Sequence, residues 1–320
     1  MDARHCYDAR RPFLTTVVAL LVVSLTSASE DVECHKLSGS GGCASEIIEL
    51  PIQSEVYGNS RMLRVLLPAS YHHSDDAYPV FYFLDGVATM DAFGLDLPGV
   101  LEQLKSEPPL REFIIVAIDN GGSTSTTSNP AVDRAAEYIP YPDPSWTEPP
   151  VPVAKGKLFP DFLFGEIEPL ISETFRVRNG AENTGIGGYS YGGLAALYTI
   201  VQHPERIGLA IIESPSLHVS EGRIEGQLDK LRSWQGRIHL GVGTAEGETL
   251  EHQREMVQNV LSLASAIRSA APDAELNVAL VNGGTHWFDA WRARLPGAIR
   301  FVFTCESAQM PGCADQSVRQ

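Results

Sequence analysis

Residues 183–198 read NTGIGGYSYGGLAALY, and this stretch decides the fold. A short apolar run ends in glycines, and an Ala- and Leu-rich helical pattern follows Tyr191 at once. The pattern predicts a strand, a sharp turn and a helix, with Ser190 at the apex. Gly188 and Gly192 leave room for the neighbouring strand and helix around such a strained turn. Because a helix N-terminus favours developing negative charge, we interpret Ser190 as a nucleophile rather than a chance serine.

The composition is that of one acidic α/β domain. The chain has 320 residues, 43% of them hydrophobic, which is enough for a single large core. The formal net charge of −16 argues against nucleic acid or an anionic membrane surface as a partner. The sequence shows no internal repeat and no convincing linker, so we expect a single domain over residues 29–320.

The N-terminus has the features of a secretory signal peptide. Basic residues precede an apolar run over residues 13–25, and small residues at 26–28 offer a cleavage site after Ala28. The apolar run is short for a membrane span, which leaves a signal-anchor as the less favoured alternative. We therefore expect residues 1–28 to be removed and the mature protein to be secreted or extracytoplasmic, with no stable membrane span.

The cysteines agree with export. Removal of the signal leaves Cys34, Cys43, Cys305 and Cys313, two close pairs on either side of a cysteine-free body. This suggests one local disulfide near each end, although the other two pairings stay open because chain termini often lie close together. Neither pair has the Cys-x-x-Cys spacing of a zinc site, and we expect no metal or organic cofactor.

Apolar runs and helical patterns alternate along the rest of the chain. We expect strands at residues 46–50, 62–67, 79–84, 113–118, 207–212, 238–242 and 276–281, and helices at 96–106, 159–171 and 249–270. Continuous apolar runs separated by helices predict a mainly parallel sheet with helices on both faces. Residues 119–157 lack periodicity, so we expect a long loop there whose aromatic residues form a wall of the substrate cleft.

A serine nucleophile needs a general base, and the base needs an orienting carboxylate. In sheets of this type the partners follow the serine on loops after later strands, first the acid and then the histidine. His286 follows the strand predicted at 276–281 across an Asn-Gly-Gly-Thr turn, so we predict that it is the base. His218 also lies on a loop after a strand, and we expect it to line the pocket instead.

Three glutamates are candidates for the acid. Glu246 directly follows the strand predicted at 238–242 and is our choice, with Glu248 as runner-up and Glu213 third. Each of them has the alternative interpretation of a solvated or helix-capping side chain.

The oxyanion of an acyl-transfer intermediate needs two preorganised N–H donors. One should be the backbone N–H of Tyr191, and the other should come from the loop at residues 85–87. We expect Asp85, Tyr138, His218 and Trp287 to lie around the substrate pocket.

An ordered set of motifs resembles the putative-esterase branch of the α/β-hydrolases. That branch includes enterochelin-type siderophore esterases, feruloyl and acetylxylan esterases, S-formylglutathione hydrolases and mycolyltransferases. The resemblance covers roughly residues 46–303 and rests on residues 82–86, 134 with 137–140, 162–163 with 166, the serine turn, 214–216, and 284–287 with 291. It implies an α/β-hydrolase fold with Ser190 as nucleophile, His286 as base and an acid near Glu246. It also implies an oxyanion hole built from the N–H groups of Val87 and Tyr191.

The sequence therefore predicts a secreted serine esterase that acts on a small-molecule or glycan-linked carboxylic ester. Ser190 attacks the carbonyl, His286 moves the proton, and water hydrolyses the acyl-enzyme. An acyltransferase would use the same residues with another acceptor, and a peptidase is less favoured. A secreted binding protein on the same fold is the non-enzymatic alternative.

Overall fold

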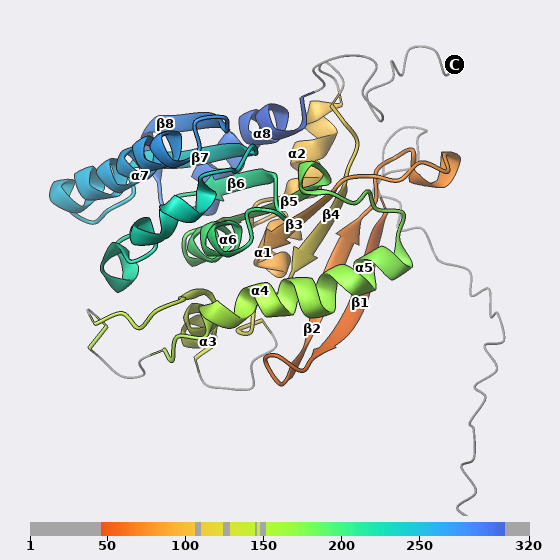
Figure 1. Cartoon of the computed structure of the whole chain (residues 1–320), viewed down its shortest axis with the longest axis horizontal. Coiled ribbons are helices and arrows are strands. Elements are labelled where there is room, and N and C mark those ends of the chain that lie inside the picture. Colours follow the sequence, from red (N-terminus) through yellow and green to blue (C-terminus); the bar gives the residue numbers. More distant parts are fainter. Residues whose placement is uncertain (1–45, 106–109, 124–128, 145, 148–151, 305–320) are drawn as a thin grey trace, which may run out of the picture. The chain divides into compact units, whose positions relative to one another are not determined.

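The computed structural model describes residues 46–105, 110–123, 129–144, 146–147 and 152–304 (Figure 1). All of them belong to one compact unit, Leu37–Gln320. The predicted signal segment and the four cysteines proposed to form disulfides lie outside the described residues. Cleavage after Ala28 and the two disulfides therefore remain predictions.

A single eight-stranded sheet forms the centre of this unit (Figure 1). The strands, in the order β1-β2-β4-β3-β5-β6-β7-β8, are antiparallel from β1 to β4 and parallel from β4 to β8. The predicted mainly parallel sheet is confirmed. The bounds are β1 Ile47–Ser54, β2 Asn59–Leu66, β3 Val80–Leu84, β4 Ile114–Ile118, β5 Thr184–Tyr189, β6 Leu209–Glu213, β7 Arg237–Ala245 and β8 Glu275–Thr285.

Helices cover both faces of the sheet, as predicted, because successive strand residues point to opposite sides. Phe81 and Phe83 of β3 pack with α2 and α8, whereas Tyr82 and Leu84 pack in a second cluster with α3 to α7. The bounds are α1 Gly86–Met90, α2 Leu97–Leu104, α3 Pro130–Tyr138, α4 Phe159–Phe162, α5 Glu168–Thr174, α6 Tyr191–Gln202, α7 Leu250–Ala270 and α8 Phe288–Phe303.

The last two strands are longer than predicted. β8 includes the Asn-Gly-Gly-Thr segment at 282–285, so the prediction of a flexible turn before His286 is wrong. Pairing with β7 continues across a register shift between Gly243 and Ala245, and Gly283 supplies a φ of +73° there. His286 therefore follows a hydrogen-bonded strand instead of a free loop.

The segment predicted to be a long loop contains a helix, α3. Asn129 caps its N-terminus by accepting a hydrogen bond from the Val132 N–H at 3.4 Å, and Pro130 occupies the first turn. The prediction of loop structure is wrong for residues 130–138. Polar composition hid the helix, whose inner face is set by tertiary contacts of the buried Glu137 and Tyr138.

A buried ion pair ties α3 to the sheet. Arg61 of β2 donates to Glu137 at 2.6 Å, and both side chains are almost fully buried. Glu137 also accepts the Gly121 N–H at 2.7 Å, and the guanidinium lies 4.5 Å from the ring centre of Phe162. The pair therefore holds the antiparallel strands, α3 and α4 together.

We predict that Arg61→Gln lowers the free energy of unfolding by about 3–5 kcal/mol, because it leaves Glu137 buried without a cation. Urea denaturation measures the change. Lys105→Gln, which removes the exposed partner of Glu102, is the control and should cost less than about 1 kcal/mol. Equal effects of the two substitutions would contradict this description of the Arg61 pair.

Candidate active site

Strand register brings the predicted chemical groups to one edge of the sheet. Parallel pairing of Tyr189 with Glu213 puts Ser190 beside the end of β6, and the Ser190 N–H donates to the Glu213 carbonyl at 3.0 Å. Ala245 and Thr285 are the last paired residues of β7 and β8, so the two strands end side by side. The residues that follow this pair are Glu246 and His286, so they begin side by side.

Ser190 occupies the strained turn that the sequence predicts. It has φ 56° and ψ −125° between β5 and α6, a backbone conformation that is costly for a residue with a side chain. A Cβ on Gly188 would lie 2.6 Å from the backbone carbon of Gly192, which explains the glycine before the turn. The space at Gly192 is less restricted, with the Asp85 carboxylate 3.0 Å from the equivalent position.

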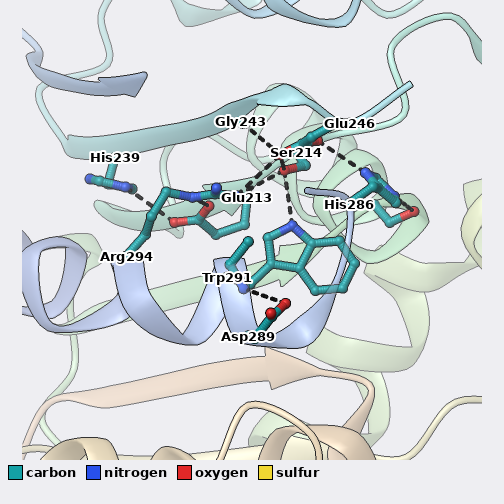
Figure 2. Close-up of polar contacts among 11 residues, drawn as sticks. Glu213, Ser214, His239, Gly243, Glu246, His286, Asp289, Trp291 and Arg294 are labelled. Atoms are coloured by element: carbon teal, nitrogen blue, oxygen red, sulfur yellow. Dashed lines mark hydrogen bonds and ion pairs between the residues drawn. The ribbon is translucent and has the colours of Figure 1, made fainter. Parts of the chain in front are cut away.

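A continuous hydrogen-bonded chain joins Ser190, His286 and Glu246. The distance from His286 Nε2 to Ser190 Oγ is 3.0 Å. The distance from His286 Nδ1 to Glu246 Oε2 is also 3.0 Å (Figure 2). Glu248 is exposed, and Glu213 points toward other partners. Of the three glutamates weighed from the sequence, the structure thus brings Glu246 to the histidine.

The second oxygen of Glu246 has two neutral donors at short distance, and the Arg294 guanidinium lies further away at 3.4 Å. Oε1 accepts hydrogen bonds from the Gly243 N–H and from the Ser214 hydroxyl, both at 2.6 Å. The Ser214 hydroxyl in turn accepts the Trp291 indole N–H at 2.9 Å (Figure 2). These donors hold Oε1 in place and leave Oε2 aimed at His286. Ser214 has a φ of 45°, a second strained residue beside the site.

Trp291 also fixes the plane of the histidine. Its ring stacks on Tyr189 at 4.5 Å and meets the His286 ring edge-on at 4.9 Å. The indole is 3% exposed, so its position is set by packing rather than by solvent. The sequence indicates Trp291 only through the family resemblance, and no motif predicts its hydrogen bond to Ser214.

A buried charge cluster behind the site was missed from the sequence. Arg294 of α8 donates from Nε to Glu213 at 2.7 Å and from Nη2 to Ser214 at 3.0 Å. The same Nη2 lies 3.4 Å from Glu246 Oε1, and His239 Nε2 lies 3.2 Å from Glu213 Oε1 (Figure 2). The available signal was the position of Arg294 on the apolar face of a helix, next to Leu295 and three residues after Trp291.

The two candidate oxyanion donors have different surroundings. Tyr191 is the first residue of α6, so its N–H belongs to the free N-terminal groups beside Ser190. Val87 lies in the first turn of α1, where its N–H faces the carboxylate of Asp119. Burial raises the pKa of Asp119, whereas Arg64 and the Val87 N–H act to lower it. The Val87 N–H therefore lies near a carboxylate, and its part in the oxyanion hole stays a prediction.

Two of the predicted pocket residues are buried supports instead. Asp85, at φ 64°, accepts two hydrogen bonds from Arg134 at 2.7 Å and one from Asn120 at 2.6 Å. Its own N–H donates to the Tyr138 hydroxyl at 3.1 Å. Asp85 is 2% exposed and Tyr138 fully buried, so the prediction that they line the pocket is corrected. They brace the strained turn after β3 from inside the protein.

The other two predicted pocket residues are accessible. Trp287 is 64% exposed and directly follows His286. His218 is also exposed as a residue, but its imidazole ring is partly surrounded by protein. This partial burial lowers the pKa of His218, and the neighbouring His252 and His286 lower it by smaller amounts. The ring centre of His218 lies 6.1 Å from that of His252.

No group of three or more His, Cys, Asp or Glu is arranged to hold a metal ion among the residues that the structure describes. Within the same residues, no helix combines the length and apolar character needed to cross a bilayer.

Eight strands, a strained serine turn and a serine–histidine–glutamate chain define an α/β-hydrolase. Sequence comparison assigns the family within that class: the profile of the family described as “Putative esterase” matches residues 54–302. The chain belongs to this esterase family, which confirms the resemblance recognised from its motifs.

Individual relatives are distant in sequence. The uncharacterized protein YbbA of Bacillus subtilis is 22% identical over 253 residues, 78% of this chain and 95% of that protein. An IroE-like serine hydrolase from Shewanella oneidensis has a TM-score of 0.66 at 22% identity, covering 81% of this chain and 80% of that one. The siderophore hydrolase EstA of Aspergillus nidulans has a TM-score of 0.65 at 20% identity, covering 83% and 98%. Both structures share the α/β-hydrolase fold.

We predict that His218 titrates below the usual histidine value of 6.5, because burial and two neighbouring imidazoles disfavour its charged form. Titration of its imidazole proton by NMR measures the midpoint. His252→Ala should raise the midpoint without restoring the usual value, since burial is the larger cause. A midpoint at or above 6.5 in the unaltered protein would contradict this prediction.

Proposed function

We propose that the protein is a serine esterase in which Ser190, His286 and Glu246 form the catalytic triad. The observation that carries the proposal is the unbroken chain of two 3.0 Å hydrogen bonds that ends at the strained serine turn. Membership of the esterase family supports ester hydrolysis as the reaction. The residue roles and the acyl-enzyme are our inference from the geometry.

In the first half-reaction, Ser190 Oγ attacks the ester carbonyl while His286 Nε2 accepts the hydroxyl proton. Glu246 accepts the Nδ1–H and stabilises the imidazolium that forms. The negative charge moves to the carbonyl oxygen, where the Tyr191 N–H is positioned to donate. His286 then gives its proton to the leaving alcohol as the C–O bond breaks, which leaves an acyl group on Ser190.

In the second half-reaction, water replaces the alcohol. His286 accepts a proton from the water as its oxygen attacks the acyl carbonyl, and returns that proton to Ser190 Oγ as the acid leaves. The enzyme ends with the same protonation states with which it began. A hydrolase therefore needs only a water path to the exposed side of His286, whose side chain is 30% accessible.

The proposed substrate is a small-molecule or glycan-linked ester. We propose that the enzyme is exported and meets this substrate outside the cytoplasm. The exposed indole of Trp287 offers an apolar surface directly beside His286, and His218 offers a polar one. Solved relatives include siderophore hydrolases and a ferulic acid esterase. A panel of short acyl esters, feruloylated sugars and catecholate siderophores would define the acyl and alcohol preferences.

We predict that Ser190→Ala lowers turnover of an aryl ester by at least about a thousandfold and abolishes fluorophosphonate labelling. Ser216→Ala is the matched control, because the Ser216 hydroxyl lies 3.4 Å from Ser190 Oγ and is an alternative nucleophile. It should retain labelling and lose less than about tenfold in turnover. Labelling that survives Ser190→Ala but is lost in Ser216→Ala would show that Ser216, and not Ser190, is the nucleophile.

We predict that Glu246→Gln lowers kcat by roughly a hundred- to ten-thousandfold with KM little changed, because the amide cannot stabilise the imidazolium. Glu248→Gln changes the same functional group two residues away on an exposed side chain and should cost less than about tenfold. Steady-state kinetics on both variants measures the difference. A crippled Glu248→Gln with a nearly normal Glu246→Gln would identify a different acid.

A further inference from the structure

The cluster of buried charges behind the proposed triad has no role in the steps described above. It consists of Glu213, His239 and Arg294, all at most 6% exposed, and it touches Glu246 through the arginine (Figure 2). We propose that Arg294 is a positioning residue for Glu246. We also propose that Glu213 is the counter-ion of Arg294 and partly offsets the positive charge that Arg294 places near the triad. This inference rests on the proposed function, because Glu246 acts there as the triad acid.

The arginine spans the ends of two strands. Its Nε is bound to Glu213, the last residue of β6, while its Nη2 reaches both Ser214 and Glu246. A guanidinium has rigid, planar donors, so fixing Nε on Glu213 also fixes where Nη2 points. The Ser214 hydroxyl, which accepts from Arg294, is left to donate its own proton to Glu246. Arg294 therefore sets the direction of the 2.6 Å hydrogen bond that holds Oε1.

The sheet makes room for the counter-ion. A Cβ on Gly241 would lie 2.1 Å from Glu213 Oε2, closer than any side chain allows. The carboxylate thus lies across the face of β7 at a glycine and extends to Arg294 on α8. Replacement of Gly241 by any larger residue would displace Glu213 from the arginine.

The charges of Glu213 and Arg294 affect the histidine that gains a proton during catalysis. Two carboxylates, Glu213 and Glu246, face one guanidinium, and each carboxylate also faces a histidine, His239 or His286. With both histidines neutral the cluster carries one net negative charge. The imidazolium that forms on His286 during attack cancels that charge within the cluster, while an equal negative charge develops on the substrate carbonyl oxygen, outside the cluster.

The test is the pH dependence of kcat/KM, because a merely structural role would not move it in a defined direction. Arg294→Gln removes a positive charge near His286, which then holds its proton to higher pH, so the acid limb should move up by about half to one pH unit. Glu213→Gln removes a negative charge, so the acid limb should move down by a similar amount. The two shifts have opposite signs.

Positioning is tested in the same variants through kcat. Arg294→Gln should lower kcat by about ten- to a hundredfold with KM within about threefold, since ground-state binding is untouched. Arg294→Lys keeps the charge but loses the fork, so it should keep the normal acid limb while kcat stays reduced. Arg61→Gln removes another buried guanidinium away from the site and should destabilise the fold without moving the pH profile.

The outcomes separate this inference from the proposed function. If wild-type protein hydrolyses esters through Ser190, but the acid limbs of Arg294→Gln and Glu213→Gln are unchanged or shift the same way, the role given to Arg294 is wrong. If Arg294→Gln is inactive because it fails to fold, circular dichroism will show it, and the Glu213→Gln and Arg294→Lys profiles decide the matter. If the wild-type protein is neither active nor labelled at Ser190, the proposed function itself fails.

Discussion

The register between β7 and β8 is the constraint on which the site depends. Ala245 pairs with Thr285 beyond an irregularity in the ladder, so the residues that follow, Glu246 and His286, leave the sheet at the same level. A shift of one residue in either strand would turn a side chain to the opposite face and break the 3.0 Å contact. The strained turn after β5 then has only to direct the Ser190 hydroxyl toward an imidazole that is already oriented.

Stability and chemistry compete in the layer beneath the triad. Strained backbone at Ser190 and Ser214 and the buried charges of Glu213, Glu246 and Arg294 all cost free energy on folding. The hydrogen bonds that the charged groups make recover part of that cost, and the long apolar strands on both sides supply the rest. The same donors that compensate for burial also restrict Glu246 to one orientation, and Glu246 in turn orients His286, the proposed general base.

Local chemistry explains which features the sequence revealed. Continuous apolar runs and the glycines around Ser190 are visible in the order of residues, so the strands and the strained serine turn were predictable. The extension of β8 and the burial of Asp85 and Tyr138 depend on partners far along the chain, such as the ladder with β7 and the ion pair with Arg134. No periodicity reports such pairings. An arginine on a buried helix face is visible in sequence, but its partners are not.

Trapping of the acyl group on the protein tests the proposed mechanism. Wild-type protein mixed with an activated aryl ester and quenched in acid within milliseconds should carry one acyl group, found by mass spectrometry on the peptide that contains Ser190. The adduct should form in the same burst as the released phenol and decay at the rate of turnover. Turnover with no covalent intermediate, or an adduct on any other residue, would contradict the central claim that Ser190, His286 and Glu246 work as one catalytic unit.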